Sequence, residues 1–198
     1  MEETVRTPGK SMDFDYFINE LLPRIKNTPV INFMGGEPTL HPQFNDIFTQ
    51  TLDAMPSYTS LGLFTNGLMS DKVLDMLVNV IGRDGALKRK ITFSVLLNWQ
   101  TLDNISEKNH ERCREVAEML MRKNGYSITF SINLYSKDQD IKTQCEEIDS
   151  MYQKVGLPKD QQYRIRVSPA FPIVGGESNI YLPIQDYPKL GRKMFQLL

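Results

Sequence analysis

Short apolar runs recur along this chain about every 30 to 36 residues, and a helical pattern separates each run from the next. The runs begin near Val30, Leu61, Ile91, Ser127 and Tyr163. Two parallel strands need a crossover connection of roughly a dozen residues or more, which is usually a helix. The alternation therefore predicts a parallel α/β fold. Because the period is unbroken, we expect one domain over 1–198, with a flexible N-terminus over 1–10.

Capping residues indicate where the predicted helices begin. We expect helix starts at Ser11, Pro42, Ser70 and Ser106, a fifth helix that ends at Gly156, and a sixth that starts near Ile184. The first element is thus a helix, whereas a parallel α/β domain normally opens with a strand. We take this order as a hint that both ends of a larger barrel are missing.

The expected strands have one apolar and one polar face. In the fourth run, Ile128, Phe130, Ile132 and Leu134 alternate with Ser127, Thr129, Ser131 and Asn133. Parallel strands covered on both faces usually read as continuous apolar runs, and a closed barrel fills its interior with bulky branched residues. A polar inner face instead indicates a wide or incomplete barrel with a wet interior. An antiparallel sheet with one solvated face also alternates and remains an alternative.

Two polar turns follow the first two strands. The first is Gly35-Gly36-Glu37-Pro38-Thr39-Leu40-His41-Pro42, and the second is Thr65-Asn66-Gly67. Ligands of parallel sheets bind outside the carboxyl ends of the strands, where glycine lets the backbone approach them closely. Backbone carbonyls and Glu37 are suited to an ammonium group. A simple strand-to-helix turn explains the first motif equally well when it is taken alone.

Taken together, these motifs resemble the radical S-adenosylmethionine (radical SAM) superfamily. The resemblance covers nearly the whole chain, and its most specific part is the stretch from Ile31 to Pro38. The weaker parts follow in order: Thr65-Asn66-Gly67, Ser94, Asn133 and Val167-Ser168-Pro169. The resemblance implies a partial (β/α)6 barrel without its first strand. Members bind S-adenosylmethionine in the open interior, where a reduced [4Fe-4S] cluster cleaves it to methionine and a 5′-deoxyadenosyl radical.

The resemblance also implies roles for individual residues. The backbone of Gly35, Gly36 and Glu37 would meet the methionine ammonium group, and Pro38 would shape the turn. Thr65 and Asn66 would complete the cofactor-binding turns. Ser94 and Asn133 would contact the ribose or the carboxylate of the cofactor. Arg166 would balance the charge of that carboxylate, and the stretch from Val167 would border adenine.

The cysteine content departs from the family pattern. Radical SAM proteins hold their cluster with three closely spaced cysteines on the loop after the first strand, which would lie before Ser11. This chain has only Cys113 and Cys145, each on the apolar stripe of an expected helix. Since cluster iron needs thiolate ligands, we expect neither a metal site nor radical chemistry from these residues alone.

Composition excludes several other classes. Lys plus Arg is 23 and Asp plus Glu is 24, which argues against a broad basic surface for nucleic acid or membrane. No apolar run is long enough to span a bilayer, and the first ten residues lack the apolar region of a signal peptide. With two cysteines, a cytoplasmic location is the default expectation.

The remaining candidates have ordinary structural interpretations. We expect His41 to be a turn residue and His110 to be solvated, and we expect Lys88-Arg89-Lys90 and Gly175-Gly176-Glu177 to lie in loops. Trp99 either stacks on a ligand or packs under a loop.

Three functions remain open on the sequence alone. The chain is a truncated radical SAM core, or a degenerate module that binds S-adenosylmethionine, a nucleotide or another protein, or an unrelated phosphate-binding barrel. The last is disfavoured, because no glycine-rich loop leads into a helix near the last strands.

Overall fold

The fold is known from a computed structural model that describes residues 11–57, 59–81, 90–100, 105–123, 126–134, 139–156 and 164–169. The helical elements are α2 (Phe14–Tyr16), the π-helix η1 (Phe17–Leu21), α3 (Leu22–Ile25), the 3₁₀ turn η2 (Pro38–Leu40), α4 (Phe44–Ala54), α5 (Asp71–Ile81), α7 (Glu107–Arg122) and α8 (Ile141–Val155). The strands are β1 (Val30–Phe33), β2 (Ser60–Thr65), β3 (Thr92–Trp99), β4 (Tyr126–Leu134) and β5 (Arg164–Pro169).

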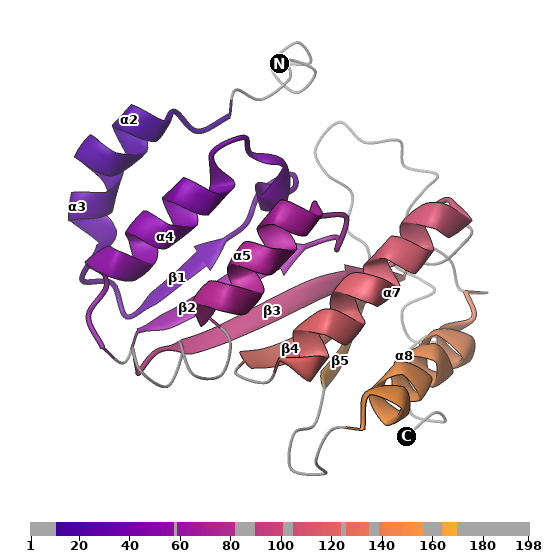
Figure 1. The fold of residues 1–198 in the computed structure, drawn as a ribbon. Coiled ribbons are helices and arrows are strands. Elements are labelled where there is room, and N and C mark those ends of the chain that lie inside the picture. The colour runs from indigo at the N-terminus through magenta and orange to yellow at the C-terminus, as the bar shows by residue number, and fades with distance from the viewer. Residues whose placement is uncertain are drawn as a thin grey trace.

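The strands form a single sheet in the order β1-β2-β3-β4-β5, and every neighbouring pair is parallel. The predicted parallel α/β class is therefore confirmed, and the antiparallel alternative is wrong. Strands that follow one another in sequence also lie side by side in space, with a helix in each connection from β1 to β5 (Figure 1).

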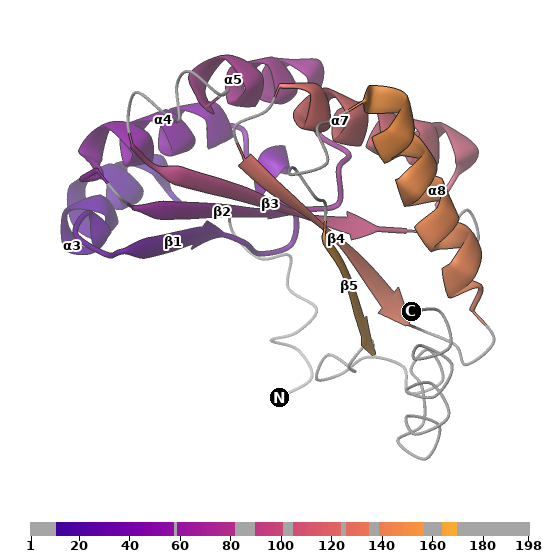
Figure 2. The same cartoon turned by 90° about the horizontal axis from the view of Figure 1, so that it is seen from below.

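All four connecting helices lie on one side of the sheet. Figure 2 shows α4, α5 and α7 above the strands and α8 continuing this layer down the right side, beside β4 and β5. The strand residues that face this layer are mainly apolar, and seven of them are completely buried: Leu61, Leu63, Phe93, Val95, Leu97, Phe130 and Ile132. The opposite side, which we call the open face, carries none of the described helices. This one-sided cover explains the alternation in the sequence.

An aromatic cluster joins α4 to strands β1 and β3. The Phe48 ring lies 5.2 Å from Phe33, 5.7 Å from Phe44 and 5.7 Å from Phe93, measured between ring centroids. Phe48 itself is fully buried. A second small cluster, formed by Phe17, Leu22 and Ile47 and their apolar neighbours, packs the first helical stretch against α4.

Two predicted helix starts are displaced. Asp13, not Ser11, caps the first helix by accepting a hydrogen bond from the Tyr16 amide, and α4 begins at Phe44, two residues after Pro42. Capping by Ser70 and Ser106 is confirmed. So is the helix end at Gly156, which has φ +68° and satisfies two carbonyls of the last turn of α8.

The first helix contains an unpredicted π-helical turn at η1. Leu22 N–H donates to the Phe17 carbonyl, five residues earlier, and the next residue is Pro23. Proline has no amide hydrogen to continue the ordinary ladder, which accounts for the wider turn beside it.

Several features expected from the sequence lie outside the described residues. These are the flexible N-terminus over 1–10, most of the basic run at Lys88-Arg89, the Gly175-Gly176-Glu177 repeat and the helix expected from Ile184. Among the described helices, none has both the length and the hydrophobicity needed to cross a membrane.

We predict that Phe48→Ala lowers the free energy of unfolding by about 3–5 kcal/mol, because the change leaves a cavity among three aromatic rings. Urea denaturation at neutral pH measures this effect. Tyr16→Ala is the control, since that side chain is 50 % exposed and its removal opens no cavity. Equal losses in the two variants would contradict the central place of Phe48 in the core.

Candidate functional site

The two polar turns lie next to each other at the carboxyl edge, meaning the edge of the sheet where the strands end. Gly35 and Gly36 follow β1, and Thr65-Asn66 closes β2, its parallel neighbour. Gly35 has φ +153°, a conformation that other residues rarely adopt, and both glycines are exposed. A Cβ atom at Gly36 would meet no atom within 4 Å. The glycine backbone is therefore open to a ligand.

The carboxylate of Glu37 joins the two turns. Its Oε1 accepts hydrogen bonds from the Thr39 amide (3.2 Å), the Thr39 hydroxyl (2.6 Å) and the Thr65 hydroxyl (2.8 Å). Its Oε2 accepts from the Asn66 amide (2.6 Å). Three of these four bonds satisfy Oε1, so Oε2 keeps the greater acceptor capacity for a cation. The side chain of Glu37 thus fixes the turns and leaves the neighbouring backbone exposed.

The second turn is closed by its own side chains. The Thr65 hydroxyl accepts from the Gly67 amide (3.1 Å), and the Asn66 side-chain oxygen accepts from the Leu68 amide (2.9 Å). Gly67 has φ +79°, and a Cβ atom there would lie 2.9 Å from the Leu97 side chain. Both the backbone conformation and the close packing therefore require glycine at this position.

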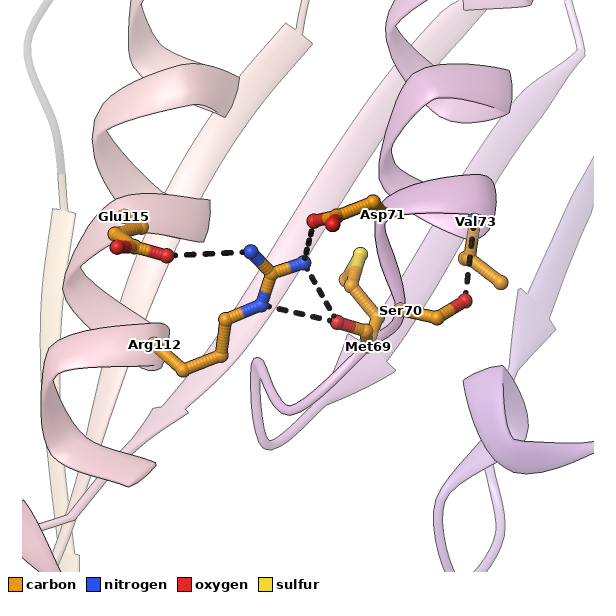
Figure 3. A network of polar contacts seen from close by, with 6 residues as sticks. All are labelled: Met69, Ser70, Asp71, Val73, Arg112 and Glu115. Carbon is orange, nitrogen blue, oxygen red and sulfur yellow. Dashed lines mark hydrogen bonds and ion pairs between the residues drawn. The ribbon is translucent and has the colours of Figure 1, made fainter. Parts of the chain in front are cut away.

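Helix α7 supports the second turn from behind. The Cys113 thiol donates to the Asn66 carbonyl (3.0 Å). Beside it, Arg112 donates to the Met69 carbonyl from Nε (3.2 Å) and Nη2 (2.9 Å), and it also pairs with Asp71 and Glu115 (Figure 3). The turn is consequently held between Glu37 on one side and α7 on the other.

Neither cysteine resembles a cluster ligand. Cys113 is buried on α7, and burial together with the nearby charge of Glu37 raises its pKa to about 11. Burial also raises the pKa of Cys145 on α8. Both groups are therefore protonated thiols at neutral pH. Among the residues that the structure describes, no group of three or more His, Cys, Asp or Glu side chains is arranged to hold a metal ion.

His41 is a turn residue, as predicted. Its Nδ1 accepts from the Gln43 amide (3.1 Å), so Nε2 carries the hydrogen and donates to the Met12 carbonyl (2.7 Å). This pair of contacts attaches the start of the first helix to the loop after β1. It places the segment before α2 at the carboxyl edge of the sheet.

A pocket of about 660 Å³ opens beside the first turn, between the first helical stretch, β1 and η2. Its wall is mainly apolar, and the polar groups of Asn32, Glu37 and His41 line it in part. Met34 and Leu40, at 66 % and 70 % exposure, are the most exposed large apolar side chains of the described residues, and both border this pocket.

Ser94, Asn133 and Arg166 all lie on the open face, as the alternation predicts. Side chains paired in register across parallel strands point to the same side of a sheet. Ser94 pairs with Gly62, Arg166 with Ser131, and Asn133 with Ser168. The hydrophilic residues of β3, β4 and β5 therefore face away from the helical layer.

The structure brings together only part of the predicted site. Gly35, Gly36, Glu37 and Pro38 meet Thr65 and Asn66 at one end of the carboxyl edge, whereas Ser94, Asn133 and Arg166 follow on successive strands away from it. The Ser94 hydroxyl makes a long contact of 3.4 Å to the Leu61 carbonyl.

Asn98 is a residue of this face that sequence reasoning missed. Its side-chain oxygen accepts from the Asn133 amide (2.8 Å). The same period of two that indicated Ser94 also marks Asn98, four residues further along β3. The sequence pattern therefore already indicated Asn98, because strand residues separated by an even number of positions lie on the same face of the sheet.

The expectation for His110 is wrong. The side chain is buried, its Nε2 lies 2.7 Å from Glu147 on α8, and its Nδ1 lies 3.1 Å from the Gln100 carbonyl. Trp99 packs rather than facing a ligand: it is 2 % exposed on the helix side and makes edge contacts with His110 and Phe130. The polar sequence around His110 misled the interpretation, because its acidic partner is 37 residues away.

Comparison with protein-family models and with curated proteins finds no match to this chain. The functional interpretation therefore depends on the geometry of the carboxyl edge and the open face.

We predict that Glu37→Gln lowers the free energy of unfolding by about 1–3 kcal/mol. The amide keeps the size of the side chain but replaces one acceptor oxygen with a donor, so a partly buried donor of the turns loses its partner. Urea denaturation measures the loss, and hydrogen exchange at the Asn66 amide localises it. Glu20→Gln is the control, because that carboxylate is exposed and pairs only with Arg24 among the described residues. An unchanged Asn66 exchange rate would contradict the bridging role of Glu37.

We also predict that stability falls as the pH rises from about 9 to about 11. The pKa of Cys113 is raised from its ordinary 9.0 to about 11, so the unfolded chain releases this proton before the folded chain does. Unfolding is thereby favoured within that window, whereas below it both states keep the proton. Urea denaturation across the window should show a shallower decline for Cys113→Ala than for the wild type. Cys145→Ala retains the Cys113 contribution, and identical slopes for the wild type and Cys113→Ala would refute the assignment.

Proposed function

We propose that this chain binds S-adenosylmethionine at the carboxyl edge of its sheet, as the cofactor-binding part of a radical SAM enzyme. The observation that carries the proposal is the Glu37 bridge. It holds an exposed Gly35-Gly36 backbone at the end of β1 and leaves Oε2 with spare acceptor capacity. Backbone carbonyls and a carboxylate oxygen are suitable acceptors for an ammonium group.

The topology supports a partial barrel rather than a doubly wound sheet. In a doubly wound fold the strand order reverses at a switch point and helices cover both faces. Here the order is sequential and the connecting helices share one side (Figure 2). We propose that this sheet is one wall of a (β/α) barrel, with the open face as its inner wall.

The inner wall offers polar groups for the rest of the cofactor. Thr65, on the helix side of β2, and Asn66 stand beside the glycine turn, and the inner wall itself carries Ser94 on β3 and Asn133 on β4. We propose that the first two shape the methionine end of the site through the Glu37 bridge. Ser94 and Asn133 then provide hydroxyl and amide groups to the nucleoside.

A [4Fe-4S] cluster does not fit the residues of this chain. The sequence has two cysteines, and both are protonated groups packed in different helices. Cluster iron is held by thiolates, usually three or four of them. We therefore propose cofactor binding for these 198 residues and derive no radical step from them. A radical reaction would need thiolates supplied from outside this sequence.

The second candidate is a binding module without chemistry, for S-adenosylmethionine, a nucleotide or another protein. The hydrogen bond from the Cys113 thiol to the Asn66 carbonyl favours this second candidate, because the thiol then supports the turn after β2 rather than binding iron. The two candidates differ in whether a cluster completes the site at the carboxyl edge.

We predict saturable binding of S-adenosylmethionine to the chain without iron, and at least about tenfold weaker binding to Gly36→Lys. The new ammonium would occupy open space, so the fold tolerates it while it repels the cofactor's own cation. Isothermal titration calorimetry measures both affinities. Gln50→Lys makes the same change of charge on an exposed position of α4 and should bind as the wild type does.

Two outcomes would overturn the proposal. Absence of heat with the wild type at millimolar cofactor would exclude both candidates that bind S-adenosylmethionine. Equal affinity of Gly36→Lys and the wild type would place the cofactor elsewhere. Separately, anaerobic reconstitution that gave a stoichiometric [4Fe-4S] absorption spectrum would refute the statement that these residues cannot hold a cluster.

A further inference from the structure

Two arginines stand together on the open face. Arg164 and Arg166 are two residues apart on β5, so they share a face and their Cα atoms lie about 6.6 Å apart. In register, Arg164 pairs with Thr129 and Arg166 with Ser131. Both arginines are exposed. At these two register positions β4 carries hydroxyl side chains, and Asn133 follows on the same face, in register with Ser168.

These arginines have no acidic partner in the described part of the chain. Each of the other four described arginines (Arg24, Arg112, Arg114 and Arg122) forms at least one ion pair with a carboxylate. None of the five strands contains Asp or Glu. The open face at β5 therefore carries two positive charges that the described residues of the protein do not balance.

Arg166 is also oriented for an external partner. Its Nε donates to the Ser168 hydroxyl (3.0 Å), which fixes the plane of the guanidinium group and leaves both terminal nitrogens available among the described residues. An oriented guanidinium group binds carboxylate or phosphate oxygens in pairs. Nearby, Asn98 accepts from Asn133 through its oxygen, which leaves the amide hydrogens of Asn98 as further donors.

We propose that Arg164 and Arg166 bind the carboxylate or phosphate group of a second ligand, the substrate, on the open face of β4 and β5. This assignment rests on the proposed function, because it treats the open face as the wall of a cofactor site. It gives the substrate a chemical class: a small molecule or peptide that carries an anionic oxygen group.

The spacing of the strands separates this group from the cofactor. Adjacent strands lie about 4.8 Å apart, so β5 is about 19 Å from β1 along the sheet. The ammonium and carboxylate groups of methionine are attached to one carbon atom. A cofactor whose ammonium group lies at Gly36 therefore keeps its carboxylate near β1 and β2. Arg166 is accordingly assigned to the substrate rather than to the cofactor carboxylate expected from the sequence.

The test is a titration of the whole chain followed by ¹H–¹⁵N NMR, with inorganic phosphate and succinate as separate probes at constant ionic strength. We expect saturable shifts at the backbone amides of β5 and of its neighbours on β4. Affinity should fall at least about fivefold in Arg164→Gln and in Arg166→Gln, and saturation should disappear in the double variant. Arg24→Gln, which removes a paired and exposed arginine, should leave the affinity unchanged. The two probes distinguish a phosphate site from a carboxylate site.

The outcomes separate this inference from the proposed function. Binding of S-adenosylmethionine to the double variant with wild-type affinity, together with loss of anion binding, supports both. If the cofactor binds the wild type but neither anion shifts β5, the inference is overturned and the proposed function stands. If the anions bind but the cofactor does not, the anion site stands and the proposed function fails. If the double variant loses cofactor affinity, the arginines serve the cofactor and the inference is wrong. Thermal unfolding of each variant verifies that the fold is retained.

Discussion

The site depends on one carboxylate with four donors. Glu37 receives a hydroxyl and an amide from its own turn and a hydroxyl and an amide from the turn after β2, so one side chain fixes the relative position of two strand ends. Hydrogen bonds to an ionised group are stronger than those between neutral groups, and partial burial strengthens them further. The same charge contributes to the raised pKa of Cys113, whose thiol holds the second turn from the other side. One network thus extends from the glycine turn to α7.

The one-sided helical layer explains most of the remaining structure. Because α4, α5, α7 and α8 cover a single face, the strands need apolar side chains at every second position only (Figure 2). The other positions are free to carry hydroxyl, amide and guanidinium groups. A sheet covered on both faces would have to pair or exclude those groups, because burying them without partners costs free energy. The polar character of the open face is therefore a consequence of the topology.

Local sequence patterns predicted the helices and strands well. Contacts between residues far apart in the sequence could not be predicted from those patterns. The period of two in β4 and the caps at Ser70 and Ser106 depend on residues a few positions apart, and these predictions were correct. The Glu37 contacts to Thr65 and Asn66 join positions 28 and 29 residues apart, and the sequence indicated only that each polar turn follows the carboxyl end of a strand. His110 shows the opposite error. Its polar neighbours suggested a solvated position, but Glu147 on another helix binds it within a buried contact.

The open face has a polarity along the sheet that suggests how two ligands would meet. At the carboxyl ends of β1 and β2 the available groups are the backbone carbonyls of the glycine turn and the Glu37 carboxylate, which attract a cation. At β5 they are guanidinium groups, which attract an anion. Between them, Phe64 and Leu96 pair in register on β2 and β3, and both side chains are half-buried on the same face. Such an apolar centre binds neither charged end and suits an aromatic ring. A cationic cofactor and an anionic substrate would therefore each be held by its charged end and would bring their uncharged parts together over the middle strands.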